Sequence, residues 1–109
     1  MTSDEQRPVV EVIITAPDEA WLVAFTRRLV EDRLAACGHH APIRSVYTWD
    51  GAIHDQPETR VAIHTQANHV EAIIDRINTE HPYEVPCVIA TPIIEALPAY
   101  RAWIVDATS

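Results

Sequence analysis

A chain of 109 residues with 48% hydrophobic and 22% charged side chains has the size and composition of one folded, soluble domain. Its formal net charge of −8 would repel a phosphate backbone, which argues against nucleic acid as the main partner. No apolar run approaches the roughly 20 residues that span a bilayer, so we expect no membrane partner.

The N-terminal segment and the cysteines bear on the compartment. The segment is polar and lacks a basic region followed by an apolar run, so we expect no secretory signal and a cytoplasmic protein. We predict a single domain over residues 1–109, of which residues 1–7 are disordered. Cys37 and Cys87 lie far apart and form no CxxC pair, so we predict two buried, reduced thiols.

A first strand and a first helix are indicated by the spacing of the apolar residues. Residues 9–14 are mostly β-branched, which favours a short and mostly buried strand. Thr15 can cap a following helix, with Pro17 in its first turn. Apolar residues then recur at helical spacing as far as Cys37, and Gly38 is a natural left-handed stop.

A long β-hairpin is predicted in the middle of the chain. Residues 39–54 alternate aromatic and β-branched side chains with others, which favours a strand. Gly51 inside this run predicts a bulge or bend rather than an end. Residues 55–58 are the predicted turn, and residues 59–65 return as a strand. Because the chain has only two glycines, a phosphate-binding P-loop or dinucleotide loop is excluded.

The last third of the chain predicts a helix, a strand and a final helix. Asn68, with Glu71 three residues later, resembles a capping box, and apolar residues follow at helical spacing as far as His81. Residues 85–94 are apolar on both faces and predict a buried fourth strand. Residues 99–106 predict a short terminal helix.

The order of these elements is β-α-β-β-α-β followed by a helix. It predicts an α+β, ferredoxin-like sandwich, in which a four-stranded antiparallel sheet carries two helices on one face. The other face of the sheet then needs a cover. The hairpin at residues 45–63 is more apolar than a solvated sheet face would be, which indicates burial against other subunits.

A metal-binding hypothesis starts from His81, Glu84 and Cys87. Their imidazole, carboxylate and thiolate groups are all ligands of zinc or copper. Pro82 and Pro86 prevent a helix here, so the spacing of three need not bring the groups together. We predict that His81 and Glu84 supply two ligands of a weak site completed by a partner. The alternative is that His81 caps the last carbonyls of its helix.

Aromatic residues and further histidines lie on the predicted hairpin. Tyr47 and Trp49 share a strand face, where they either pack at a subunit contact or stack against a ligand. We expect His54 and His64 to face one another across the hairpin or across a subunit contact. No HxH or HxxxH pattern fixes a metal geometry. We also find no nucleophile-and-base motif, so we expect no enzyme.

Four short motifs follow one another along the chain, namely Leu34-Ala35-Ala36-Cys37, Ser45-Val46-Tyr47-Thr48-Trp49-Asp50-Gly51, His81-Pro82-Tyr83-Glu84-Val85-Pro86 and Tyr100-Arg101-Ala102-Trp103. With these motifs in register, the chain resembles the CutA divalent-cation-tolerance family from about Val9 to Trp103. It departs from the family at three positions. Ile14 stands where some members carry a cysteine proposed as a copper ligand, and His39 and His64 stand where asparagine and lysine are common.

The resemblance implies a tight homotrimer, similar in architecture to the PII signalling proteins, with no firmly attached enzyme reaction. It implies tolerance of copper and other divalent metals, with weak Cu²⁺ or other metal binding that folding does not require. The implied site is a cleft between subunits, lined by Tyr47, Trp49, Tyr83, His81 and Glu84. Two functions stay open: a trimeric metal-responsive protein, or a PII-like sensor that binds a small-molecule effector at its subunit clefts.

Overall fold

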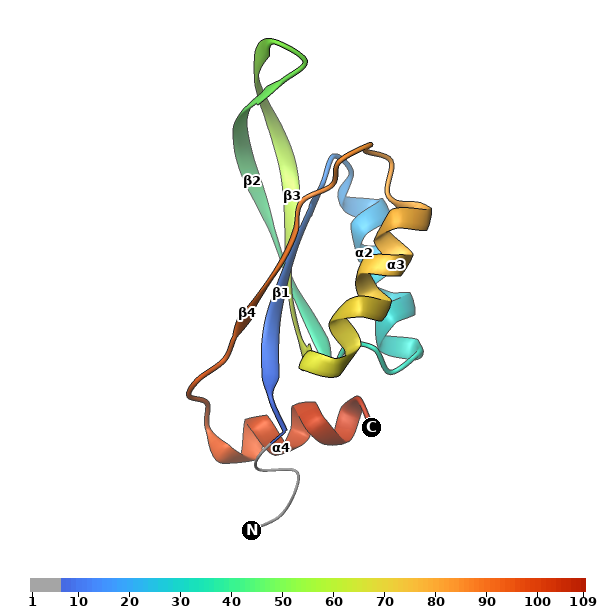
Figure 1. Cartoon of the computed structure of the whole chain (residues 1–109), viewed down its shortest axis with the longest axis vertical. Helices are drawn as coiled ribbons and strands as arrows, with labels where there is room; N and C mark the ends of the chain where they lie inside the picture. The colour runs from blue at the N-terminus through green and yellow to red at the C-terminus, as the bar shows by residue number, and fades with distance from the viewer. Residues whose placement is uncertain (1–6) are drawn as a thin grey trace.

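The computed structural model describes residues 7–109, over which four strands and three α-helices follow in the predicted order (Figure 1). They are β1 (Val9–Ala16), α2 (Glu19–Glu31), β2 (Cys37–Trp49), β3 (Ala52–Gln66), a 3₁₀ turn (Ala67–His69), α3 (Val70–Glu80), β4 (Val88–Pro92) and α4 (Pro98–Ala107). The strands pair antiparallel in the order β2-β3-β1-β4. The predicted α+β, ferredoxin-like fold is confirmed, whereas most of the segment predicted to be disordered, residues 1–6, lies outside the described residues.

Helices α2 and α3 lie side by side on one face of the sheet (Figure 1). Their inward positions recur every three or four residues, as the helical period requires. Leu22, Phe25 and Leu29 of α2 and Ile73 and Ile77 of α3 are fully buried against the sheet. Each such side chain contributes about 1.5–3 kcal/mol by its burial. Within the described residues, no helix is long and apolar enough to cross a membrane.

The boundaries of α2 differ from the prediction. Asp18, not Thr15, caps the helix, and its side chain accepts a hydrogen bond from the backbone N–H of Trp21 at 3.1 Å. The helix ends at Glu31, and Arg33, with φ of 61°, takes the left-handed position that had been expected for Gly38. Helical spacing of apolar residues continues past the true end because the following segment also packs against the core.

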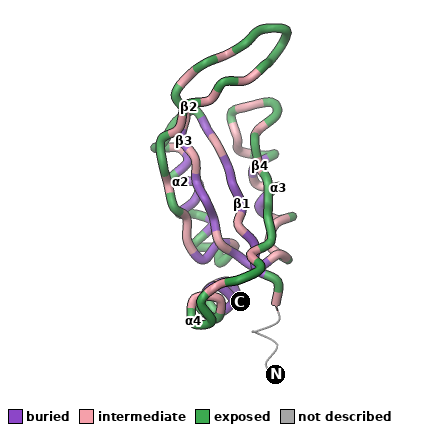
Figure 2. The backbone as a smooth tube through the Cα atoms, turned by 90° about the vertical axis from the view of Figure 1, so that its left-hand side faces the viewer, coloured by how far each residue is buried: buried purple, intermediate pink, exposed green. Residues whose placement is uncertain are grey.

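The hairpin of β2 and β3 turns at Asp50 and Gly51, whose φ angles of 52° and 78° match a type I′ turn. The predictions that Gly51 forms a bulge and that residues 55–58 form the turn are therefore wrong. A two-residue Asp-Gly turn matches the right-handed twist of the strands, so the strands pair without a bulge from the turn to their far ends. The tip of the hairpin projects beyond the helices and is exposed or half-buried (Figures 1 and 2).

Two further predictions fail in the last third of the chain. α3 begins after the 3₁₀ turn without a side-chain cap, so Asn68 does not form a capping box. β4 is shorter than predicted and lies at the edge of the sheet beside β1, which leaves Ile89 55% exposed rather than buried. Cys37 and Cys87 are free thiols, but Cys37 is only half-buried and Cys87 is exposed.

The opposite face of the sheet, which we call the open face, carries alternate side chains of β1 and β3 that include Glu11, Ile13, Ala62 and His64. The helix α4 packs against one end of this face. There it forms a second small core of buried side chains, namely Val9, Ala36, Ile104 and Val105. The terminal helix was predicted within one residue at each end.

Candidate functional site

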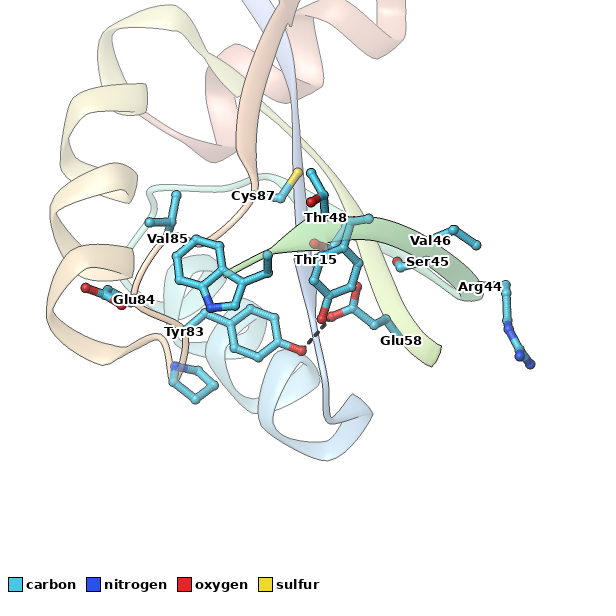
Figure 3. Close-up of a pocket in the computed structure, with 13 residues that line it drawn as sticks. Thr15, Arg44, Ser45, Val46, Thr48, Glu58, Tyr83, Glu84, Val85 and Cys87 are labelled. Atoms are coloured by element: carbon cyan, nitrogen blue, oxygen red, sulfur yellow. Dashed lines mark hydrogen bonds between the residues drawn. The ribbon is translucent and has the colours of Figure 1, made fainter. Parts of the chain in front are cut away.

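A groove of about 710 Å³ lies between the hairpin and the segment that follows α3 (Figure 3). Four of the five residues predicted for a ligand or metal site line it: Tyr47, Trp49, Tyr83 and Glu84. The fold brings them together because β2 and the Pro-rich corner at residues 82–86 both reach the same end of the sheet. Whether any of the five residues binds a ligand stays a prediction.

A hydrogen-bond network joins the groove's polar side chains. The Tyr83 hydroxyl donates to Glu58 Oε2 at 2.8 Å (Figure 3). Next to it, Gln56 Nε2 donates to the Tyr47 hydroxyl at 2.6 Å. Burial, followed by the Glu58 carboxylate, raises the pKa of Tyr83 to about 12. At neutral pH this phenol is therefore a hydrogen-bond donor and not a base. The groove can stack and hydrogen-bond a ligand.

The two hairpin histidines do not meet within the subunit. His54 lies opposite Tyr47 in the strand register and stacks on its ring with centroids 5.3 Å apart. His64 lies ten positions further along the same strand, opposite Cys37. The prediction that His54 and His64 face one another across the hairpin is thus wrong. A contact between them across a subunit boundary stays a prediction.

His81 serves as a structural bridge at the corner after α3. Its Nε2 donates to the Thr15 carbonyl at 2.8 Å, and its Nδ1 accepts from the Tyr83 backbone N–H at 3.0 Å. The ring therefore does not cap its own helix. Because both ring nitrogens are engaged, a metal ion at His81 would have to replace one of these bonds. Glu84 is exposed, and Cys87 lines the groove instead of the sheet core.

A second donor cluster lies on the open face at the other end of the hairpin. Cys37, His39 and His64 each offer a ligand atom, and these atoms all lie within 4.8 Å of one another. Cys37 and His39 are two residues apart on β2 and so share a face, and His64 is the register partner of Cys37. The prediction from sequence missed this cluster because it placed Cys37 at the end of a helix.

Two neighbours orient the cluster. Glu11, the register partner of His64 on β1, places a carboxylate oxygen 2.9 Å from His64 Nε2. The Tyr100 hydroxyl of α4 hydrogen-bonds His64 Nδ1 and lies 3.3 Å from Cys37 Sγ. Burial, followed by Cys37 and Glu11, raises the pKa of Tyr100 to about 12. The phenol is thus protonated and donates to Nδ1.

The sequence and the fold can be compared with those of known proteins. The family model of the CutA1 divalent ion tolerance protein matches residues 10–107. This chain belongs to the CutA family. The resemblance that the sequence motifs indicated is therefore confirmed.

Relatives and solved structures support the assignment. Protein CutA of Mus musculus is 38% identical over 101 residues, which are 92% of this chain, but the chain spans only 57% of that relative's length. The divalent-cation tolerance protein CutA of Pectobacterium atrosepticum is 31% identical, with 90% and 93% of the two chains covered.

Two solved CutA structures share the fold of most of this chain. CutA of Xylella fastidiosa aligns with a TM-score of 0.88 and 37% identity, over 93% of this chain and 98% of that one. The periplasmic divalent cation tolerance protein CutA of Archaeoglobus fulgidus aligns with a TM-score of 0.90 and 30% identity, over 93% and 99%. The cytoplasmic location expected for this chain stays a prediction.

Proposed function

We propose that this protein is a homotrimeric CutA protein that binds divalent metal ions such as copper in response to their presence. The observation that carries the proposal is the convergence of one thiol and two imidazoles within 4.8 Å on the open face. Thiolate and imidazole are the ligand types that copper and zinc prefer in proteins. The proposal assigns metal binding rather than an enzymatic reaction, in line with a family described by ion tolerance.

Exposed apolar side chains support the trimeric part of the proposal. Val46 and Ile53 on the hairpin are 66% and 81% exposed in the single subunit. Ile89 on the edge strand β4 is also exposed, so apolar surface lies near both edges of the sheet. Burial of such surface against further copies of the chain would stabilise an assembly.

Calorimetric titration of the full chain with Zn²⁺ and Cu²⁺ tests the metal proposal. Two double variants separate the candidate ligands: Cys37→Ser with His64→Asn, and His81→Ala with Glu84→Ala. We expect saturable binding that the first double variant loses and the second retains. His54→Ala, which removes a histidine outside both sets, is the matched control and should bind as the unchanged protein does.

The outcomes assign the site or reject the function. Loss of binding only in the His81 and Glu84 double variant would place the metal at the corner after α3 and leave the metal function standing. The metal proposal would be rejected if the heats of titration, with both Zn²⁺ and Cu²⁺, were no larger than those of a protein surface that merely carries histidines.

A small-molecule sensor is the second candidate, and the groove favours it. Its volume of about 710 Å³ falls in the range of roughly 300–1,000 Å³ typical of small-molecule sites. Tyr47, Trp49 and Tyr83 supply aromatic surface, and Glu58 and the Tyr83 hydroxyl supply polar groups. Nucleotide binding that survives both double variants and is lost in Trp49→Ala would favour this function. No nucleotide binding, or binding indifferent to Trp49→Ala, would count against it.

A further inference from the structure

We propose that Cys37, His39 and His64 bind one thiophilic metal ion, and that this ion displaces the Tyr100 hydroxyl and loosens the first turn of α4. The inference rests on the proposed metal function and adds the ligands, the class of metal and a conformational consequence.

The protonation of His64 leaves one nitrogen available to a metal. Its Nε2 faces the Glu11 carboxylate at 2.9 Å, so Nε2 carries the hydrogen and donates it. The lone pair is therefore on Nδ1, which lies 3.8 Å from Cys37 Sγ. Metal-binding histidines commonly donate their other ring N–H to a carboxylate in this way. Glu11 is thus a positioning residue for His64.

The spacing of the donors fits a tetrahedral ion. With Zn–S bonds of about 2.3 Å and Zn–N bonds of about 2.0–2.1 Å, two tetrahedral ligands lie roughly 3.5 Å apart. The observed 3.8 Å between Cys37 Sγ and His64 Nδ1 needs only a small adjustment. His39, whose ring centroid is 5.4 Å from that of His64, supplies the third donor. One thiolate and two imidazoles favour Zn²⁺, Cd²⁺ or copper over Mg²⁺ and Ca²⁺.

The Tyr100 hydroxyl occupies the place that the ion needs. It donates its single hydrogen to His64 Nδ1 and lies 3.3 Å from Cys37 Sγ, so it engages the lone pair of one ligand and lies against the sulfur of another. Thiolate and imidazole are the better ligands for these metals, and a phenol is not among their usual ones. An ion that binds Cys37 and His64 therefore expels the hydroxyl.

Loss of this contact affects one end of α4 more than the other. The C-terminal half is held by the buried side chains of Ile104 and Val105 and by Gln66, which hydrogen-bonds Thr108. The first turn is held by Tyr100 and by Arg101, which donates to the Ile93 carbonyl. The segment before it is open to solvent. Displacement of Tyr100 therefore loosens residues 98–101 and leaves the rest of the helix docked.

Anaerobic titration with Cd²⁺ tests the ligands through the near-ultraviolet band of a cadmium thiolate. We expect a saturating band that Cys37→Ser, Cys37→Ala and His64→Asn each lose. Cys87→Ser, which removes the other and more exposed thiol, should keep it. Glu11→Gln should weaken binding by about 10- to 100-fold, as changes behind a metal ligand do. Circular dichroism of each variant checks that it has folded.

Tyr100→Phe tests the displacement, because it removes the competing hydroxyl without removing the ring. We expect Cd²⁺ to bind about 2- to 10-fold more tightly, the equivalent of one hydrogen bond. Hydrogen exchange of the Tyr100 and Arg101 amides, which both donate to the Leu97 carbonyl, should accelerate when metal is added to the unchanged protein. In the Tyr100→Phe variant it should be fast without metal, and the amide of Thr108 should not respond in either protein.

Each contrary result has its own meaning. Weaker binding by Tyr100→Phe would make Tyr100 a ligand and overturn the displacement. Metal binding that survives Cys37→Ser but not His81→Ala with Glu84→Ala would overturn the site and leave the proposed function intact. An unchanged protein that binds neither Cd²⁺, Zn²⁺ nor Cu²⁺ would overturn both.

Discussion

Gly38 shows how one position sets the distance between a helix and the sheet. A Cβ atom at this position would lie 2.5 Å from Thr26 Cγ2 and 2.9 Å from Val61 Cγ2. Thr26 cannot easily move away, because its hydroxyl donates to the Leu22 carbonyl at 2.8 Å inside α2. Glycine is therefore required here by close packing and not by backbone conformation.

We expect Gly38→Ala to lower the free energy of unfolding by about 1–3 kcal/mol, as overpacking of a core does. Urea unfolding measures the change. Gly51→Asn is the control, since Gly51 has open space around it and asparagine tolerates a positive φ. Equal losses in the two variants would contradict the packing explanation.

The pKa of Tyr83 provides a second prediction for a single residue. Glu58→Gln should lower this pKa from about 12 without returning it to the ordinary value of 10.0, because burial is the larger cause. With glutamate present, folding stability is unaffected below pH 10 and falls as the pH rises toward 12, since the unfolded chain loses the phenol proton first.

NMR titration of the Tyr83 ring follows the shift. The control is Glu84→Gln, which removes an exposed carboxylate from the same groove. An unchanged pKa in Glu58→Gln would show that the hydrogen bond to Glu58 does not affect the ionisation.

The sequence predicts which helices and strands form, but it predicts their ends less well. The order of elements, α4 and the antiparallel sheet follow from apolar periodicity, which is a property of whole segments. The start of α2 depends instead on competition between two neighbouring capping residues, Thr15 and Asp18, and pairing of Thr15 within β1 decides it. Burial of β4 could not be judged because it depends on the position of the strand in the sheet.

We expect Asp18→Ala to destabilise the protein by about 1 kcal/mol, the usual contribution of an N-cap. Asp18→Ser, which keeps an acceptor for the Trp21 N–H, should restore most of the loss. Thermal unfolding compares the two variants. A larger loss in Thr15→Ala than in Asp18→Ala would indicate that the cap had been misassigned.

The candidate sites were predictable to different degrees. Tyr47, Trp49, Tyr83 and Glu84 were expected, with His81, to line one cleft through motifs of the family, and the fold places these four but not His81 along one groove of the subunit. The Cys37 cluster was missed because Cys37 was assigned to the end of a helix and because the hairpin turn was misplaced. The register of β2 against β3 is set by the turn, and Gly51 was interpreted as a bulge instead of as part of that turn. Once Asp50 and Gly51 are the turn, counting along the two strands places Cys37 opposite His64.

The shape of the whole subunit bears on assembly. Its extents are 52 × 25 × 21 Å, because the hairpin continues well past the helices (Figure 1). Side chains at the tip contact little of their own subunit, so their apolar surface cannot be explained by the core of one chain. The trimer that we propose would cover it.

Light scattering coupled to size-exclusion chromatography should give three times the mass of one chain. Ile53→Lys should reduce that mass with little loss of helical circular dichroism, since Ile53 is largely exposed within the subunit. Thr48→Lys, at the register partner of Ile53, tests whether the effect is confined to apolar positions. The mass of a single chain for the unchanged protein would refute the trimer.

The unbroken register of the hairpin links metal binding to correct pairing of the two strands. Strands joined by a two-residue turn close from the turn outward, so Cys37 and His64 meet in the pair furthest from it. A slip of one residue would turn His64 toward α2 and separate it from both Cys37 and Glu11. A hairpin with the wrong register would therefore lack a complete set of metal donors. Metal binding would distinguish subunits whose strands pair in the native register from those whose strands do not.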